Sequence, residues 1–189
     1  MRFVVGLGNP GERYRRTRHN VGFMVADALV SLAGLSPGTE ECGAWVAEGA
    51  LDASPVLVVK PLSYMNASGV AVARLLERRG GTPADLVVVV DDLALDLGRV
   101  RVRERGSHGG HNGLRSLIEE LGTGEFARVR VGIRSGELPD DVAGWVLSDF
   151  PPEDAPVVRE MVSLAADAVA CLVSEGAQAA MNRFNARPA

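Results

Sequence analysis

The feature that most constrains the fold is a run of five apolar residues at positions 86–90, which is followed directly by Asp91 and Asp92. Such a run predicts a strand that is buried on both faces of a sheet, because strands with one solvated face alternate apolar and polar residues. Strands of this kind occur where helices cover both sides of the sheet. The sequence therefore predicts an α/β fold in which Asp91 stands at the end of the most buried strand.

The periodicity of the remaining segments supports this fold class. Strands are expected at residues 2–7, 42–51, 55–59, 98–105 and 128–133, and helices at 21–33, 68–79, 112–121 and, once or twice, within 152–184. A hairpin is expected around Asp52-Ala53-Ser54, which makes the sheet mixed, and residues 134–141 are expected to form a mobile loop. We predict one three-layer α/β domain over residues 1–189, with a twisted mixed β-sheet surrounded by helices.

The composition narrows the class of protein. No apolar run approaches the roughly 20 residues of a membrane span, and the first six residues are typical of a strand and not of a signal peptide. We therefore expect a cytoplasmic protein that makes no membrane contact and works as a monomer. Cys42 and Cys171 lie far apart and lack the spacing of a zinc site, which indicates reduced thiols.

The charge pattern bears on nucleic-acid binding. A net charge of −4 is unusual for a protein that neutralises phosphates, but local charge matters more than the total. Four arginines alternate along the strand expected at 98–105, so they should project from one face: Arg99, Arg101, Arg103 and Arg105. This pattern predicts a positive stripe that contacts phosphates, and the alternative is a solvated strand face.

A glycine-rich segment, Gly6-Leu7-Gly8-Asn9-Pro10-Gly11, follows the first strand and matches the GxGxxG pattern of dinucleotide-binding proteins. We reject a dinucleotide site, because no apolar helical period follows the third glycine and no acidic residue ends a second strand. The glycines are instead expected to form a tight turn with positive φ. That turn would place Asn9 at the carboxyl end of the strand, where open α/β sheets bind their ligands.

His19 precedes an expected helix, which Asn20 could cap, and Asp91 ends the buried strand. A carboxylate that accepts one imidazole N–H fixes the tautomer and leaves the other nitrogen free to take a proton from water. Together they therefore suggest a general base and its orienting acid. A packing or capping role for His19 and a turn role for Asp91 are the alternatives.

Two further junctions between strands and helices carry polar side chains. His108-Gly109-Gly110-His111-Asn112 leads into one helix, and Asn66 stands at the start of another. Asn66 and Asn112 could cap these helices, or together with Asn9 they could bind an ester or peptide carbonyl at the edge of the sheet. His19, His108, His111 and Asp91 also include ligand types that zinc accepts, but no spacing motif supports a zinc site.

These segments together resemble the bacterial peptidyl-tRNA hydrolase family, over residues 1 to about 133. The similar motifs are Val5-Gly6-Leu7-Gly8-Asn9-Pro10-Gly11 with Tyr14 and Thr17-Arg18-His19-Asn20, then Lys60-Pro61 with Tyr64-Met65-Asn66, then Gly109-Gly110-His111-Asn112-Gly113-Leu114 and Arg130-Val131-Gly132-Ile133. Ser107-His108 and the segment 134–139 depart from the family pattern. These departures concern the rim near His111 and loop contacts to the substrate.

The resemblance implies a mixed sheet surrounded by helices, and hydrolysis of the ester between a peptide and the 3′ ribose of tRNA without a metal or cofactor. It implies His19 as catalytic base and Asp91 as the carboxylate that orients it. It implies substrate contacts from Asn9, Tyr14, Tyr64, Met65, Asn66, His111 and Asn112, and tRNA phosphate contacts from Arg101, Arg103 and Arg105. A non-catalytic RNA-binding protein with the same fold is the alternative.

Overall fold

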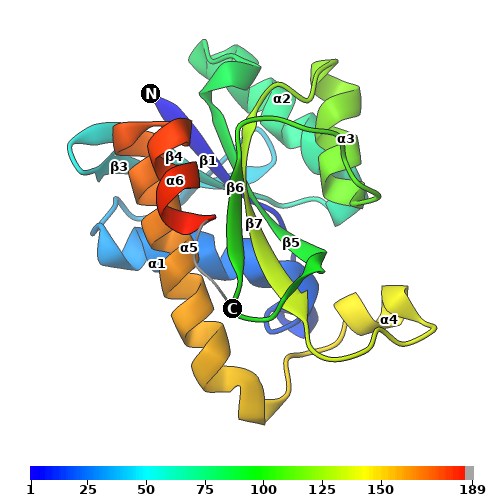
Figure 1. Ribbon diagram of the computed structural model, residues 1–189. Helices are drawn as coiled ribbons and strands as arrows, with labels where there is room; N and C mark the ends of the chain where they lie inside the picture. The colour runs from blue at the N-terminus through cyan, green and yellow to red at the C-terminus, as the bar shows by residue number, and fades with distance from the viewer. Residues whose placement is uncertain (186–189) are drawn as a thin grey trace.

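A seven-stranded mixed sheet organises the structure, a computed structural model that describes residues 1–185 (Figure 1). Its spatial order is β2-β3-β4-β1-β5-β7-β6. The strands are β1 (Arg2–Gly6), β2 (Thr39–Glu41), β3 (Ala44–Leu51), β4 (Ser54–Pro61), β5 (Leu86–Asp96), β6 (Val100–Arg103) and β7 (Ala127–Arg134). The four strands β4, β1, β5 and β7 are parallel, while β2, β3 and β6 add antiparallel edges. The predicted hairpin is present as β3 and β4.

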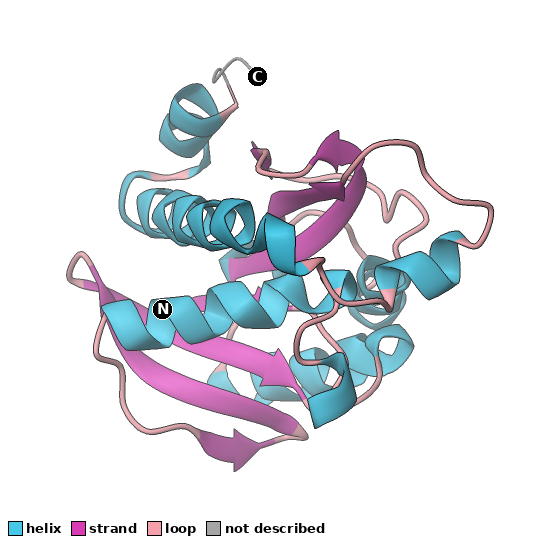
Figure 2. Cartoon of the chain, turned by 90° about the horizontal axis from the view of Figure 1, so that it is seen from below, coloured by secondary structure: helices cyan, strands magenta, loops and turns pink. Residues whose placement is uncertain are grey.

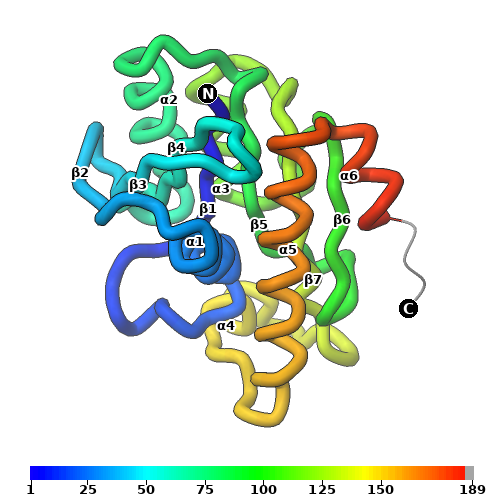
Figure 3. The backbone as a smooth tube through the Cα atoms, turned by 90° about the vertical axis from the view of Figure 1, so that its left-hand side faces the viewer, coloured from blue at the N-terminus to red at the C-terminus, as the bar shows by residue number. Residues whose placement is uncertain are grey.

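Helices cover both faces of the sheet, as the apolar run at 86–90 predicts. On one face α1 (Val21–Leu32), α5 (Ala155–Glu175) and α6 (Ala177–Phe184) pack against one hydrophobic cluster. On the other face α2 (Ser68–Arg79) and α3 (Asn112–Leu121) pack against a second cluster. Figures 1 and 3 show the sheet between these two helical layers. The predicted fold class, a three-layer domain with a mixed sheet, is confirmed.

A short helix, α4 (Val142–Val146), extends away from the layers near the far end of β7, and the long α5 leads back from it (Figures 1 and 2). Asp141 caps α4 by accepting a hydrogen bond from the backbone N–H of Gly144 at 2.9 Å. The sequence pattern does not indicate α4, because five residues are too few to show a helical period. Within residues 1–185, no helix is both long and apolar enough to cross a membrane.

The strand that carries Asp91 is longer than predicted. It continues to Asp96, paired in parallel with β7, and the register becomes irregular between Asp92 and Asp96. Burial, however, changes where the apolar run ends, because residues 86–91 are buried and the residues after them are half-buried or exposed. Asp91 therefore lies where the strand leaves the core, and not where the strand ends.

The first glycines serve close packing and not the predicted positive φ. Of the glycines in residues 6–11, only Gly11 has a positive φ, of 108°. A Cβ on Gly6 would lie 2.3 Å from the carbonyl oxygen of Gly22 in α1. The close approach of β1 and α1 is thus what requires glycine, and it brings the start of α1 to the end of β1.

The predicted arginine strand is also shorter, since β6 spans only Val100–Arg103. Arg99 and Arg105 flank the strand, so a single strand face does not carry all four arginines. Arg101 and Arg103 lie opposite Arg130 and Arg128 of β7, respectively. The positive charge is therefore spread over two strands.

Candidate active site

A cleft of about 930 Å³ opens beside the end of the buried part of β5. Side chains from the segments after β1 and β4, from β5 and from the loop before α3 line it. Ten of the predicted site residues are among them: Asn9, His19, Tyr64, Met65, Asn66, Asp91, Arg103, Arg105, His111 and Asn112. Residues that are far apart in the sequence therefore meet at one edge of the sheet. A volume of this size suits a ligand larger than a single amino acid.

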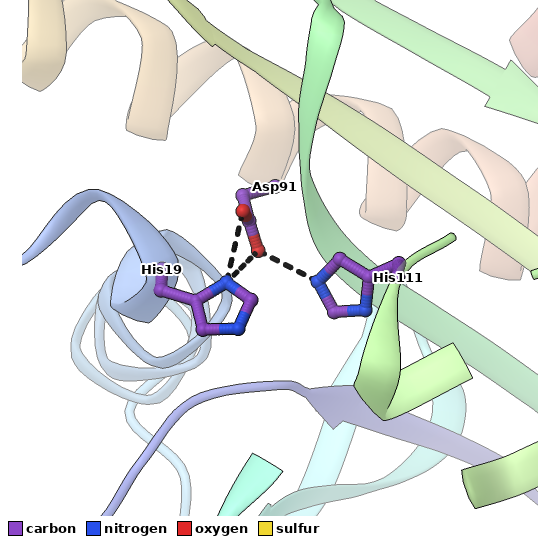
Figure 4. A group of neighbouring side chains, drawn as sticks. All are labelled: His19, Asp91 and His111. Carbon is purple, nitrogen blue, oxygen red and sulfur yellow. Dashed lines mark hydrogen bonds and ion pairs between the residues drawn. The ribbon is translucent and has the colours of Figure 1, made fainter. Parts of the chain in front are cut away.

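His19 and Asp91 are hydrogen-bonded (Figure 4). Nδ1 of His19 lies 2.9 Å from Oδ1 and 3.0 Å from Oδ2 of Asp91. The carboxylate can only accept, so Nδ1 of the neutral imidazole carries the proton and Nε2 keeps its lone pair. No residue in the described part of the chain bonds Nε2, and the ring is on the cleft wall. The geometry is that of an imidazole oriented to take a proton from a molecule in the cleft.

His111 is a second imidazole on the same carboxylate. Its Nε2 lies 2.8 Å from Oδ1 of Asp91, while its Nδ1 accepts hydrogen bonds from the backbone N–H groups of Gly113 and Leu114 at 3.1 and 3.3 Å. Because Nδ1 accepts, Nε2 must carry the proton. His111 is thus the N-cap of α3, and the sequence prediction that Asn112 could cap this helix is wrong. Capping by His111 leaves the Asn112 side chain exposed on the cleft wall.

The electrostatics of Asp91 follow from these two contacts. Its side chain is only 3% exposed, and burial alone would raise the pKa of the carboxyl group. The opposing effect is larger, because the adjacent His111 ring and the hydrogen bonds from His111 and His19 stabilise the carboxylate and hold the pKa of Asp91 below its ordinary range. Asp91 is therefore an anion throughout the neutral range.

The cluster is a poor fit for a metal, although one ligand atom each from His19, Asp91 and His111 lies within 4.8 Å of the others. A metal ligand must offer a lone pair, and Nε2 of His111 carries a proton because two backbone N–H groups occupy Nδ1. If the proton moved to Nδ1, the new Nδ1–H group would face the backbone N–H groups of Gly113 and Leu114, which are also donors. Nδ1 of His108 is also engaged, since it accepts from the N–H of Gly110 at 3.0 Å.

Asn9 is held in place by hydrogen bonds to Asn20 and Met65. The side chain of Asn20 bonds both backbone groups of Asn9, accepting from its N–H and donating to its carbonyl, each at 2.9 Å. The Oδ1 of Asn9 accepts from the backbone N–H of Met65 at 2.7 Å, which leaves its Nδ2 donors for a ligand in the cleft. Asn20 was expected as a possible cap of α1, but its side chain makes no cap bond. Its role in holding Asn9 was missed, because no sequence pattern marks it.

Asn66 and the tyrosines lie at the rim. Asn66 sits in a single 3-10 turn before α2, which has no side-chain cap, so the capping alternative for Asn66 is wrong. The side chain of Asn66 is exposed on the cleft wall. Tyr64 also lines the cleft and is 58% exposed. Tyr14 packs edge-on against Tyr64 with ring centroids 6.5 Å apart, and Tyr14 is not among the residues that line the cleft.

The predicted arginines separate into two groups. Arg103 and Arg105 line the cleft together with Arg128 and Arg130 of β7, while Arg101 is not among the lining residues. Arg128 is nearly buried and donates to the carbonyls of Ser107 and Gly124 at 2.8 and 2.9 Å, which ties the glycine-rich loop to β7. Arg128 and Arg130, which no sequence pattern marks as site charges, thus add to the arginines along the cleft, where Arg130 forms an ion pair with Asp92.

An imidazole oriented by a buried carboxylate, beside carboxamides in an open cleft, is the arrangement of an enzyme that works by general-base catalysis. Comparison with known proteins identifies the family. The family model described as peptidyl-tRNA hydrolase matches residues 3–189, and the chain belongs to this family. The resemblance inferred from the sequence motifs is thereby confirmed.

Individual relatives agree. The chain is 48% identical to the peptidyl-tRNA hydrolase of Desulforudis audaxviator, over 98% of this chain and 93% of that protein. It is also 48% identical to that of Chloroflexus aggregans, over 98% and 99%. The crystal structure of peptidyl-tRNA hydrolase from Acinetobacter baumannii superposes with a TM-score of 0.90 at 31% identity, covering 98% of this chain and 95% of that one.

Proposed function

We propose that this chain hydrolyses the ester that joins a peptide, or an N-blocked amino acid, to the 3′ ribose of tRNA, and so recycles tRNA from prematurely released peptidyl-tRNA. The observation that carries the proposal is the hydrogen bond from Nδ1 of His19 to the buried carboxylate of Asp91, which leaves Nε2 facing the cleft. Membership of the peptidyl-tRNA hydrolase family supports this substrate.

In the proposed mechanism, Nε2 of His19 takes a proton from a water molecule as the water oxygen attacks the ester carbonyl carbon. The imidazolium that forms is stabilised by the negative charge of Asp91. The tetrahedral intermediate then collapses, the bond to the ribose oxygen breaks, and the imidazolium returns the proton to that oxygen. The products are a free carboxylic acid and the 3′ hydroxyl of tRNA. No nucleophilic serine or cysteine is needed, because the ribose oxygen is a reasonable leaving group.

The carboxamides are the proposed substrate-binding groups. Asn66 and Asn112 expose N–H donors at the cleft wall, and one of them would stabilise the negative charge that develops on the carbonyl oxygen. Asn9, whose Oδ1 is held by the N–H of Met65, would offer its Nδ2 to the peptide part. Tyr14, Tyr64 and His111 remain predicted contacts, Tyr14 through its packing on Tyr64 and His111 by supporting Asp91.

Phosphates of the tRNA are the proposed partners of the arginines. Arg103 and Arg105 lie on the wall of the same cleft as His19 and would supply positive charge there, while Arg130 is ion-paired with Asp92. Arg101 is predicted to make a more distant contact, because it stands on the same strand two residues before Arg103. Contacts of this kind give affinity without reading base sequence.

The remaining predictions concern the state of the protein. We propose catalysis without a metal or cofactor, since the donor pattern around Asp91 disfavours metal binding. We propose that residues 1–189 act as one domain, because both hydrophobic clusters share one sheet. We also propose that the protein is a cytoplasmic monomer.

The test is release of the N-acetylated amino acid from N-acetyl-aminoacyl-tRNA by the purified protein in the presence of a chelator. We expect multiple turnovers. Activity that is lost in chelator and restored by a divalent metal would favour the metal alternative. Tight tRNA binding without any release would favour the non-catalytic RNA-binding alternative.

A further inference from the structure

Arg18, which directly precedes the catalytic candidate His19, is buried although it is charged. The residue is only 5% exposed, and its guanidinium carbon lies 4.3 Å from the ring centre of Trp145 and 5.5 Å from that of Phe150. A buried arginine costs free energy unless hydrogen bonds and ring contacts replace its hydration. Arg18 therefore serves a contact that an apolar residue would not make.

The side-chain hydrogen bonds of Arg18 all reach the segment that follows α4. Its Nη1 donates to Oγ of Ser148 at 2.6 Å, to the carbonyl of Asp149 at 2.8 Å and to the carbonyl of Ser148 at 3.3 Å. Oγ of Ser148 in turn donates to the carbonyl of Trp145 at 2.7 Å. The guanidinium group of Arg18 thus holds the end of α4 and the turn after it in place.

The two backbones are paired at the same place. The N–H of Arg18 donates to the carbonyl of Ser148 at 3.1 Å, and the N–H of Phe150 donates to the carbonyl of Arg16 at 3.3 Å. Thr17 and Asp149 form an antiparallel bridge between these bonds. We call residues 16–18 and 148–150 the clip. It joins two parts of the chain about 130 residues apart, as the hydrogen bonds of Arg18 record.

Each side of the clip carries part of the cleft. On one side His19 follows Arg18 directly, and its imidazole is on the cleft wall. On the other side α4 and its end contribute an apolar part of that wall, which consists of Val142, Ala143, Val146 and Leu147. The clip therefore fixes the distance between the apolar wall and the imidazole.

We propose that Arg18 is a positioning residue that holds the apolar α4 wall against the substrate at a set distance from His19. The proposal rests on the proposed hydrolysis of peptidyl-tRNA. Arg18 itself is turned into the clip and touches no reacting atom. His19 is held separately by Asp91, so loosening the clip should weaken substrate binding at the α4 wall more than it slows the chemical step.

The test compares Arg18→Met with Arg18→Lys and with Arg15→Met as a matched control. Arg15 lies in the same loop but outside the clip, 74% exposed in its side chain and 3.4 Å from Glu12. Methionine keeps most of the volume but no hydrogen bond, so Arg18→Met should raise KM about tenfold and change kcat less than about twofold. Arg18→Lys, which keeps the charge over Trp145, should fall between wild type and Arg18→Met. Arg15→Met should leave KM unchanged.

A second readout does not depend on turnover. The chain has two tryptophans, so in a Trp45→Phe background the emission reports Trp145 alone. Arg18→Met should shift this emission to the red and increase its quenching by acrylamide, while Arg15→Met should not. If Arg18→Met does not fold, Ser148→Ala, which removes one acceptor of Arg18, should raise KM about threefold with the same change in emission.

An unchanged KM, or a fall in kcat alone in proportion to the folded fraction, would overturn the proposal. Failure of the proposed function would look different. The wild-type protein would then release nothing from N-acetyl-aminoacyl-tRNA, while the emission of Trp145 would still report whether Arg18 holds α4.

Discussion

Nε2 of His111 lies 2.8 Å from the same Asp91 oxygen that accepts from His19. A carboxylate that receives two imidazole N–H groups is fixed on both sides. Since two backbone N–H groups at the start of α3 determine which nitrogen of His111 carries the proton, the helix terminus sets the orientation of Asp91. Through Asp91, it also sets the tautomer of His19.

Asp91→Asn should therefore lower kcat by about 10²–10⁴-fold. An asparagine has one acceptor oxygen and one N–H₂ group, so it cannot accept from both histidines at both carboxylate positions. The N–H₂ group at the Oδ2 position would favour the wrong tautomer of His19. Initial rates of release from N-acetyl-aminoacyl-tRNA give kcat, and far-UV circular dichroism checks the fold. A wild-type rate in this variant would remove the orienting role, even if the enzyme assignment survived.

The cap and support roles of His111 can be separated by two substitutions. His111→Ala removes both, and the loss of the cap should lower the free energy of unfolding by about 1 kcal/mol. His111→Ala should also lower kcat, because Asp91 loses a supporting hydrogen bond. His111→Asn restores a good N-cap but is too short to reach Asp91, so it should recover the free energy of unfolding while its kcat stays as low as that of His111→Ala. Urea unfolding and kcat, measured on both variants, decide the matter. If His111→Asn recovered both quantities, Asp91 would need no second imidazole.

Arg103→Glu combined with Arg105→Glu should raise KM and reduce its salt dependence, because each lost phosphate contact lowers the slope of log affinity against log salt by roughly 0.7 to 0.9. The matched control is Arg101→Glu, which changes the charge equally per residue but lies outside the cleft lining. It should have a smaller effect. KM measured from 50 to 300 mM salt, on the order of the range that reveals counterion release, gives the slopes. Equal slopes in the wild type, the double variant and Arg101→Glu would indicate that the arginines form a solvated strand face and contact no phosphate.

Acid stability should depend on Asp91. A carboxyl group whose pKa is lowered by folding stabilises the native state above the pKa of the unfolded chain, about 3.9, and this stability is lost as the pH falls below it. The free energy of unfolding of wild type, minus that of Asp91→Asn, should therefore decrease as the pH drops from about 5 to about 2. Asp52→Asn, at an exposed turn, serves as the control and should follow wild type. A difference that grows on acidification would contradict the lowered pKa.

Much of the fold was predictable because burial leaves a pattern in the sequence. The apolar run at 86–90 indicates a strand covered on both faces, and the hairpin around Asp52 and Ala53 follows from strand periodicity on either side of a turn. The short elements were not predictable. Strand β2 has three residues and α4 has five, which is too few for a period.

The candidate site was predictable through motifs and not through contacts. His19 and the three asparagines stand at junctions of strands and helices, and Asp91 stands where β5 leaves the core. An α/β sheet gathers such positions at one edge. The hydrogen bonds between side chains at that edge could not be predicted from the sequence. Asn20 was expected as a possible helix cap, but it holds Asn9 instead, and the helix cap of α3 is His111. Distances between distant segments decide which of these bonds forms. The clip of Arg18 is hidden for the same reason.

The most direct test of the account is the rate of His19→Ala on N-acetyl-aminoacyl-tRNA in the presence of a chelator, with His108→Ala as the control. His108 also lies on the cleft wall, but its Nδ1 is engaged with the N–H of Gly110 and no carboxylate orients it among the described residues. Removing the general base should lower kcat by about 10²–10⁴-fold in His19→Ala, while His108→Ala should keep the wild-type rate within about threefold. A His19→Ala protein that is correctly folded and still releases the amino acid at the wild-type rate would contradict the central claim.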